Sequence, residues 1–157
     1  RFVPLTEQDT ARWRRDRFDA AEACLRRAAA LRTPGPFQLE AAIQSAHCQR
    51  AWTGRTPWAA IESIYAVLVR HFPSTGARIG HAVALGETGR VDEGLTALDA
   101  VEPARAAAHQ PWWVARAWLL RRAGRAAEAD GALERAIGLT EDPRLREHLR
   151  RTGERSA

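Results

Sequence analysis

The sequence predicts an all-helical protein in which one pair of helices is repeated along the chain. Two short patterns recur at an offset of 35 residues: Gly89-Arg90-x-x-Glu93 as Gly124-Arg125-x-x-Glu128, and Ala97-Leu98 as Ala132-Leu133. Apolar residues in these segments recur every three or four positions, which favours helices. Strict alternation of apolar and polar residues, the mark of a half-buried strand, is absent, so no sheet is predicted.

This spacing indicates a known kind of repeat. Tetratricopeptide repeats have a period of about 34 residues and contain one helix–turn–helix each. Gly89 and Gly124 then fall in the turn between two helices, where glycine readily reaches positive φ. A degenerate earlier copy carries Gly54-Arg55 at the same offset, with a register slip of about two residues in the helix that follows. We therefore expect a tetratricopeptide-like array of about eight helices, coiled into a right-handed superhelix.

Small and large apolar residues about four positions apart supply the packing faces of the predicted helices. In the last repeat these residues are Trp113, Ala117 and Leu120, facing Ala129, Leu133 and Ala136. In the previous repeat they are Ala82, Leu85, Leu95, Leu98 and Val101, and in the degenerate copy Ile61, Ile64, Tyr65 and Leu68. Together they form the predicted core.

Capping signals divide the chain into helices. Thr6 through Asp9 have the spacing of a capping box, and residues 34–36 end the first long helix and start the second. Thr56 before Pro57, and Asp142 before Pro143, each place an N-cap ahead of a proline at the first helical position. The expected helices span residues 9–31, 37–51, 57–71, 76–87, 91–101, 110–123, 126–139 and 143–152. The last one, polar and rich in Arg, is expected to cap the array against solvent.

One domain is expected, because 157 residues suit a single compact unit. Residues 1–8 are expected to be a linker from a missing upstream region, and residues 9–157 the helical domain. The chain begins at Arg1 and contains no Met, which indicates a fragment of a longer protein. No run approaches the ~18 apolar residues of a membrane span, and no secretory signal is seen. Cys24 and Cys48, isolated and without metal-ligand spacing, favour a reducing, cytoplasmic setting.

The net charge of +5 comes from Arg alone, with concentrations of Arg at residues 12–17, 121–125 and 144–155. A basic balance suits nucleic acid or an acidic partner. Acidic residues are interspersed almost everywhere, however, which favours Arg as an ordinary solvated residue. Trp13 stands among Arg residues, an arrangement that can grip single-stranded nucleic acid. Cation–π contact and packing within the domain are the favoured interpretation of Trp13.

Patterns that carry chemistry are scarce. The sequence has no glycine-rich phosphate loop, and its five His are scattered. His47 and Cys48 are adjacent, so their side chains point to different sides of a helix. Glu141 and Asp142 fall at a helix start, where the helix dipole explains them. We therefore expect no catalytic residue, no cofactor and no metal site, and a binding protein rather than an enzyme.

Six Trp residues are the unusual feature of the composition. Packing between helices is expected for Trp58 and Trp113. Trp112 and Trp118 fall on other faces of the same predicted helix. One of these two is a candidate to line a concave groove, where Trp is a strong anchor for a partner.

An ordered series of motifs runs from about Pro4 to Leu149. In chain order they are Glu7-Gln8-Asp9-x-x-x-Trp13, Pro34-Gly35-Pro36-Phe37-Gln38-Leu39-x-Ala41-Ala42-Ile43, Trp58-x-x-Ile61-x-x-x-Tyr65-x-x-Leu68-x-x-x-x-Pro73-Ser74, Ala82-Val83-Ala84 and Ala115-Arg116-Ala117-x-Leu119-Leu120-Arg121-Arg122-x-Gly124-Arg125-x-x-Glu128-Ala129. This succession resembles the C-terminal extension of a group of bacterial extracytoplasmic-function (ECF) sigma factors.

The resemblance implies a domain that regulates the sigma modules preceding such extensions, or that contacts RNA polymerase or another regulator. It implies DNA contact only through those upstream modules, and neither a cofactor nor a catalytic residue. Asp9, Trp13, Trp58 and Arg116 match positions that recur in the family's motifs. The groove formed by the first helix of each repeat is then expected to hold a peptide segment.

The sequence also departs from the family's pattern. Arg14 stands where the family usually has Asp, Gly80-His81 replaces Asn-Arg, and Trp113 and Trp118 replace a His and an Asp. These departures leave open a second function, in which a Trp-lined groove binds a small aromatic or apolar ligand or a peptide, even with an acquired reaction through His81 or His109. The candidate groove residues are Asp9, Trp13, Trp58, His81, Trp112, Trp113, Arg116 and Trp118.

Overall fold

The computed structural model describes residues 2–154, and every regular element in that range is a helix, as predicted. Two 3₁₀ turns, η1 (Leu5–Glu7) and η2 (Thr10–Arg12), precede α1 (Arg15–Ala30). The remaining helices are α2 (Pro36–Cys48), α3 (Arg50–Thr53), α4 (Trp58–His71), α5 (Thr75–Glu87), α6 (Val91–Asp99), α7 (Pro103–Ala107), α8 (Gln110–Arg122), α9 (Ala126–Gly138) and α10 (Pro143–Glu154).

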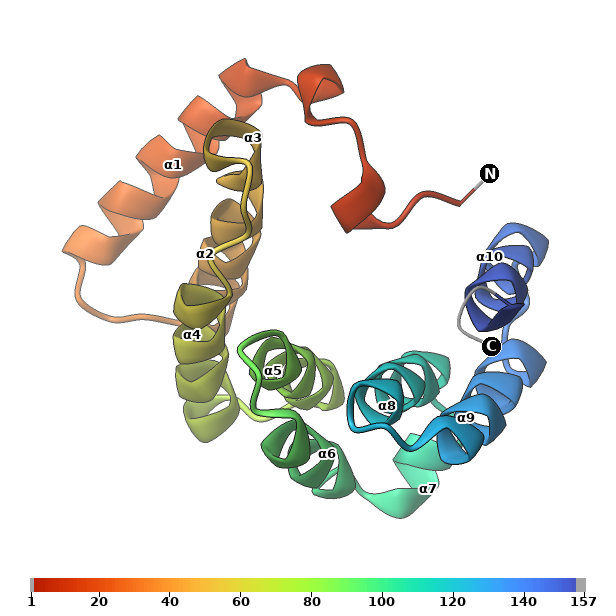
Figure 1. Ribbon diagram of the computed structural model, residues 1–157. Helices are drawn as coiled ribbons and strands as arrows, with labels where there is room; N and C mark the ends of the chain where they lie inside the picture. Colours follow the sequence, from red (N-terminus) through yellow and green to blue (C-terminus); the bar gives the residue numbers. More distant parts are fainter. Residues whose placement is uncertain (1, 155–157) are drawn as a thin grey trace.

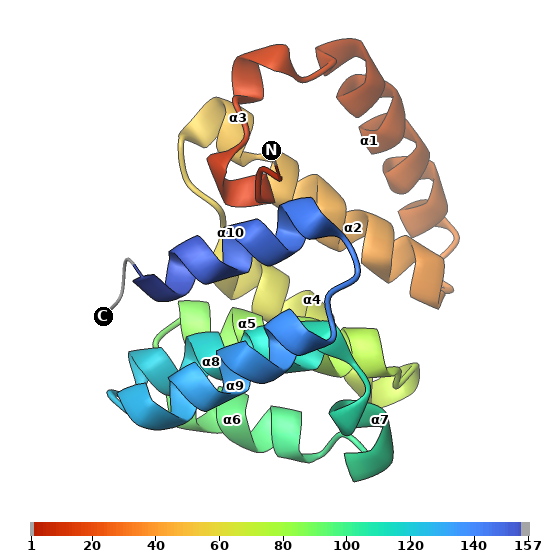
Figure 2. The ribbon, with the colours of Figure 1, turned by 90° about the vertical axis from the view of Figure 1, so that its right-hand side faces the viewer.

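Neighbouring helices pack in chain order around an arc (Figure 1). α1 packs on α2, α2 on α4 and α4 on α5, and two helical hairpins, α5–α6 and α8–α9, follow side by side. α10 packs on α9 at the far end of the arc. The N-terminal segment runs back toward α10 in both views (Figures 1 and 2), where the rings of Phe2 and His148 have centroids 5.2 Å apart.

The two hairpins share one turn geometry, 35 residues apart. Gly89 and Gly124 both have positive φ, +88° and +75°, as the sequence predicts. In each turn the backbone N–H of the residue after the glycine donates to a carbonyl of the preceding helix. Arg90 donates to Leu85 and Arg125 to Leu120, both at 2.9 Å. Because these bonds satisfy carbonyls that the helix end leaves free, they fix the turn in both copies.

The third copy of the turn keeps the glycine and loses the register. Gly54 has φ +71°, yet α4 begins four residues later at Trp58, whereas α6 begins two residues after Gly89. The predicted slip of about two residues is therefore confirmed. Pro57 is the N-cap residue of α4 rather than its first helical residue, and no side chain caps this helix.

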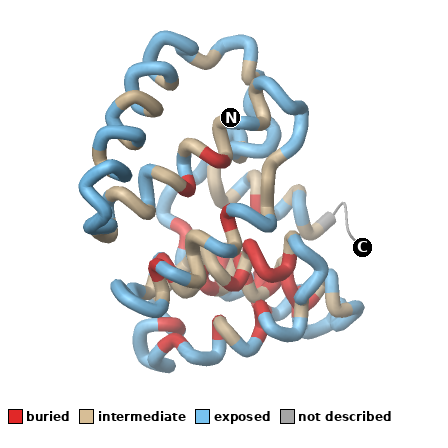
Figure 3. Tube along the Cα trace, turned by 90° about the vertical axis from the view of Figure 1, so that its left-hand side faces the viewer, coloured by how far each residue is buried: buried red, intermediate tan, exposed pale blue. Residues whose placement is uncertain are grey.

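The apolar faces form two clusters of buried side chains. The larger joins α5 and α6 to α8, α9 and α10, and it contains every residue of the predicted stripes in the last two repeats except Leu85 and the partly buried Trp113. Leu85 is itself buried, at 4% exposure. The smaller cluster centres on Ile43, Ile61 and Leu68 between α2 and α4. Figure 3 shows buried residues concentrated in the α4–α9 region, with α1 coloured as exposed or intermediate throughout.

The N-terminal boundaries differ from the sequence prediction. The first long helix begins at Arg15, not at residue 9, because Trp13 adopts an extended backbone with ψ 141°. The predicted capping box is not formed. Thr6 lies inside η1, and the carboxylate of Asp9 instead accepts from the Ala11 N–H and caps η2.

Two further differences concern short helices. The predicted 37–51 helix is divided at Gln49 into α2 and α3. α7 was not predicted. It begins at Pro103, a favoured first helical residue, and the side chain of the preceding Glu102 accepts from the Ala104 and Arg105 N–H groups. At the other end of the chain, Asp142 caps α10 as predicted, accepting from the Arg144 N–H at 2.8 Å. Arg155, in the predicted C-terminal Arg concentration, lies outside the described residues.

Candidate functional site

A long groove of about 860 Å³ lies between α1 and the α2–α3 segment. Its lining residues are Phe18, Asp19, Ala21, Glu22, Cys24, Leu25 and Ala28 from the α1 side, and Phe37, Gln38, Ala41, Gln44, Ser45, Cys48, Gln49 and Trp52 from the α2–α3 side. α1 buries none of its 16 residues, whereas every other described helix of more than five residues buries at least one. The groove is therefore an uncovered apolar face of the fold.

Helical periodicity creates both walls of this groove. Phe18, Ala21, Leu25 and Ala28 recur at intervals of three and four, so they share one face of α1. Across the floor, the Ser45 hydroxyl donates to the Glu22 carboxylate and ties α2 to α1.

A cluster of aromatic rings lies at one end of the groove. The ring of Phe18 lies 5.7 Å from the rings of both Trp13 and Trp52. Arg50 stacks over Trp13 at 5.3 Å, and Arg15 over Trp52 at 5.4 Å. These distances suit aromatic and cation–π contacts, so the three rings form one cluster with an Arg over two of them.

The rim of the groove exposes large apolar side chains. Phe37 is 84% exposed and Trp52 43%. The charged lining residues are Asp19 and Glu22, both acidic, in a chain whose 24 basic residues are all Arg. Asp19 forms no ion pair among the described residues. The groove therefore combines exposed apolar surface with two carboxylates in its lining.

Both cysteines line this groove as free thiols, Cys24 exposed and Cys48 half-buried. Burial raises the pKa of the Cys48 thiol, and the nearby Glu22 carboxylate raises it further. The side chain of Arg27 donates to the Cys24 sulfur at 3.3 Å. The two thiols therefore differ in environment within one groove.

Of the N-terminal candidates Asp9 and Trp13, neither lines the groove, but the Trp13 ring contacts Phe18, which does. Asp9 is exposed and caps η2. The indole N–H of Trp13 donates to the Gln8 side chain at 3.3 Å. The guanidinium of Arg50 also donates to the Leu5 and Gln8 carbonyls, at 2.9 and 3.1 Å. This segment, expected to be a linker up to residue 8, is thus bonded to α3.

Trp58 and His81 lie away from that segment. Trp58 packs on the smaller cluster, as expected, with the His47 ring edge-on at 5.2 Å. Burial lowers the pKa of His47. His81 Nε2 lies 3.0 Å from Glu62 Oε1, and both side chains are 18% exposed.

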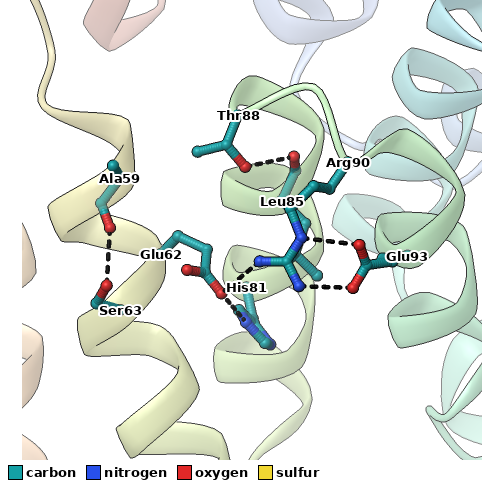
Figure 4. Close-up of polar contacts among 8 residues, drawn as sticks. All are labelled: Ala59, Glu62, Ser63, His81, Leu85, Thr88, Arg90 and Glu93. Carbon is teal, nitrogen blue, oxygen red and sulfur yellow. Dashed lines mark hydrogen bonds and ion pairs between the residues drawn. The ribbon is translucent and has the colours of Figure 1, made fainter.

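A polar chain extends from His81 across three helices (Figure 4). The Glu62 carboxylate of α4 lies between His81 of α5 and the guanidinium of Arg90, 3.5 Å away. Arg90 in turn donates two hydrogen bonds to Glu93 of α6, at 2.8 and 2.6 Å. The Arg90 guanidinium thus lies between two carboxylates, and the arrangement ties the helices together.

The four α8 candidates face two directions. Trp112 is the buried one, at 7% exposure, and its indole N–H donates to the Leu98 carbonyl at 3.0 Å. Trp113, expected to be the packed residue, is only partly buried and donates to the Ala107 carbonyl at 3.1 Å. Arg116 stacks over Trp112 at 5.1 Å and donates to Asp99 at 2.6 Å.

Trp118 lies instead against Gly86 of α5, with Arg122 over its ring at 4.4 Å.

The structure therefore brings Trp112, Trp113 and Arg116 together, and it places Trp118, His81 and Trp58 in separate local clusters. Sequence reasoning missed the α1–α2 groove. Its signal was the exposed apolar stripe of α1 combined with Phe37 at the start of α2. The stripe is visible in the sequence, but its pairing with α2 is not. Among the described residues, no cluster of three or more His, Cys, Asp or Glu side chains could hold a metal ion, and none of the helices is long and apolar enough to span a membrane.

Comparison with known proteins gives a relative that matches most of this chain. An uncharacterized protein of Rhizobium meliloti (strain 1021) is 34% identical over 139 residues, covering 87% of this chain and 32% of the relative. The chain thus spans about a third of the length of the curated relative it matches. No family model matches the chain, and no solved structure matches it.

Proposed function

We propose that this chain is a protein-interaction and regulatory domain of a bacterial ECF sigma factor. In this role it acts in the cytoplasm, on the sigma modules, RNA polymerase or a regulator. The observation that carries the proposal is the uncovered groove between α1 and α2, whose rim exposes Phe37 and Trp52. An apolar groove with exposed aromatic side chains beside it is the kind of surface on which a protein partner can dock. The motif series from Pro4 to Leu149 supports the sigma-factor assignment.

A tetratricopeptide-like array is part of the proposal. Its support is a set of hydrogen bonds that the turns after α5 and α8 share. Arg90 and Arg125 make the same backbone bond, and each donates two side-chain hydrogen bonds to a Glu three residues later. Repeated units that pack only on their neighbours build extended surfaces for protein partners. The right-handed superhelix belongs to this proposal.

The length of the relative also supports a domain within a larger protein. The matched segment is 32% of that protein, which leaves room for promoter-binding modules in such an arrangement. DNA contact would then belong to those modules. The α8 Trp residues support a ligand pocket less well, because the indole N–H groups of Trp112 and Trp113 already donate to protein carbonyls.

The decisive experiment compares the full-length protein with a version lacking this domain. Each is mixed with purified core RNA polymerase, and binding and promoter-directed transcription are measured. We expect the full-length protein to bind the polymerase and the deletion to change transcription several-fold. A full-length protein that neither binds the polymerase nor contains DNA-binding helices upstream would overturn the proposal.

A further inference from the structure

We propose that the groove between α1 and α2 is the seat of an amphipathic helix from a protein partner, and that a basic residue of that helix pairs with Asp19. The inference rests on the proposed function, because it assigns the chemistry of the partner at the same interaction site. Its starting point is α1, a 16-residue helix that buries no side chain. Tertiary packing of an apolar face supplies most of the stability of a helix, and α2 covers the apolar face of α1 only in part.

The dimensions of the groove suit a helix. The α1 wall runs from Phe18 to Ala28, which is about 15 Å at 1.5 Å per residue. Three turns of a second helix have that length. The trough lies between two packed helices, the arrangement in which an amphipathic helix places its i, i+3, i+4 and i+7 side chains.

The exposure of Phe37 distinguishes a helix from a small ligand. Phe37 lines the groove and yet is 84% exposed, so its ring stands on the rim. A small molecule within the trough would leave most of that ring in water. A helix laid along the trough would cover Phe37, and exposed aromatic side chains of this kind become the anchors of interfaces.

The charge of the groove selects the sign of the partner. Asp19 and Glu22 are the charged lining residues, and Glu22 is engaged with Ser45. Asp19 remains without an ion pair in the part of the chain that the structure describes. A Lys or Arg on the partner helix would supply the missing charge, and a Glu there would be repelled.

The test titrates the chain with fluorescein-labelled synthetic peptides of about 16 residues, followed by fluorescence anisotropy. One peptide carries a Leu stripe at helical spacing with flanking Lys, a second replaces Lys with Glu, and a third scrambles the Leu stripe. The Lys peptide should bind best, with a preference of roughly three- to fivefold over the Glu peptide from one exposed charge pair. The scrambled peptide should not bind. Equal binding of all three peptides, or of none, would overturn the proposal.

Two pairs of variants locate the site. Phe37→Ala should weaken binding of the Lys peptide roughly tenfold, while Phe72→Ala, at an exposed Phe outside the groove, should leave it unchanged. Asp19→Arg should abolish the preference for Lys over Glu. Glu141→Arg makes the same change in net charge at an exposed residue ahead of α10 and should preserve the preference. Equal effects within either pair would contradict the proposal.

The native cysteines supply an independent readout. A bound Lys peptide should slow alkylation of Cys24 by iodoacetamide, because this thiol lines the groove. Binding without protection of Cys24 would place the peptide elsewhere. Sedimentation tests whether a second copy of the chain occupies the groove instead. Dimer formation, together with slower alkylation of Cys24 as the protein concentration rises, would show that it does. The titration contains neither sigma modules nor polymerase, so its failure is distinguishable from failure of the transcription test.

Discussion

Gly86 on α5 lies so close to Trp118 on α8 that a β-carbon at Gly86 would stand 2.5 Å from the indole ring. The side chain of Leu119 would be equally close, and Leu119 is fully buried. The missing side chain at Gly86 is therefore what allows the two hairpins to approach each other.

Replacing Gly86 with Ala is predicted to destabilise the fold by about 1–3 kcal/mol, because packed neighbours must shift to admit the methyl group. Gly131→Ala is the matched control. Gly131 lies in α9, and no atom lies within 4 Å of the place that a β-carbon would take there, so the substitution should stabilise by about 0.5–1 kcal/mol through helix propensity. Urea unfolding followed by circular dichroism measures both. Equal effects of the two substitutions would contradict this account of the α5–α8 contact.

The repeat features that follow from local chemistry could be predicted from the sequence. The turn glycines at 89 and 124 need positive φ, and the helical stripes need only a 3.6-residue period. The choice between Trp112 and Trp113 could not be predicted. Neighbouring residues point about 100° apart on a helix, and the one that is buried depends on where α6 and α7 pack.

The groove between α1 and α2 could not be predicted from the sequence either, for a related reason. The stripe of α1 can be seen in the sequence, but its alignment with α2 depends on a contact across the intervening segment, such as Glu22 with Ser45. The absence of a cover for that stripe is a property of the whole fold. An apolar face at helical spacing has the same sequence pattern whether it is buried or exposed, so the pattern alone does not distinguish a groove from the core.

The indole hydrogen bonds of Trp112 and Trp113 should contribute unequally to the free energy of unfolding. Trp112→Phe removes a buried hydrogen bond to the Leu98 carbonyl, and we expect a loss of about 1–2 kcal/mol in the free energy of unfolding. Trp113→Phe removes a more exposed bond to the Ala107 carbonyl and should cost less than about half of that. Urea unfolding of both variants gives the comparison. A larger loss for Trp113→Phe would show that the packing of α8 is misassigned.

Stability should fall as the pH is lowered through the titration of His47. Burial lowers the pKa of His47 below its ordinary value of 6.5. The unfolded chain then takes up a proton at this residue at a higher pH than the folded chain does. The stabilising contribution is therefore fully present above about pH 6.5 and is lost as the pH falls through the folded pKa.

His47→Phe isolates this effect, because it keeps a ring opposite Trp58 and removes the titration. Unfolding free energies at about pH 7.5, 6.5 and 5.5, compared between wild type and variant, measure the difference. The wild type should lose more stability on acidification. An identical pH dependence in the two proteins would rule out His47 as the titrating group.

The two groove thiols should react at different rates. Burial and the Glu22 carboxylate raise the pKa of Cys48, and the thiolate is the reactive species. In a Cys24→Ser variant, Cys48 of the folded protein should therefore react more slowly with iodoacetamide than the same thiol does in urea. The midpoint of its rate–pH curve should lie at a higher pH in the folded protein than in urea.

Glu22→Gln tests the smaller of the two causes. It removes the negative charge and keeps an oxygen that can accept from Ser45, so the rate at Cys48 should increase while the groove stays intact. The raised pKa of Cys48 also makes the free energy of unfolding depend on pH. Above the unfolded pKa the folded state holds its proton longer, so stability falls as the pH rises. A Cys48 midpoint no higher than that of the unfolded chain would mean that water reaches this end of the groove freely, and that the floor between α1 and α2 is more open than the Glu22–Ser45 contact implies.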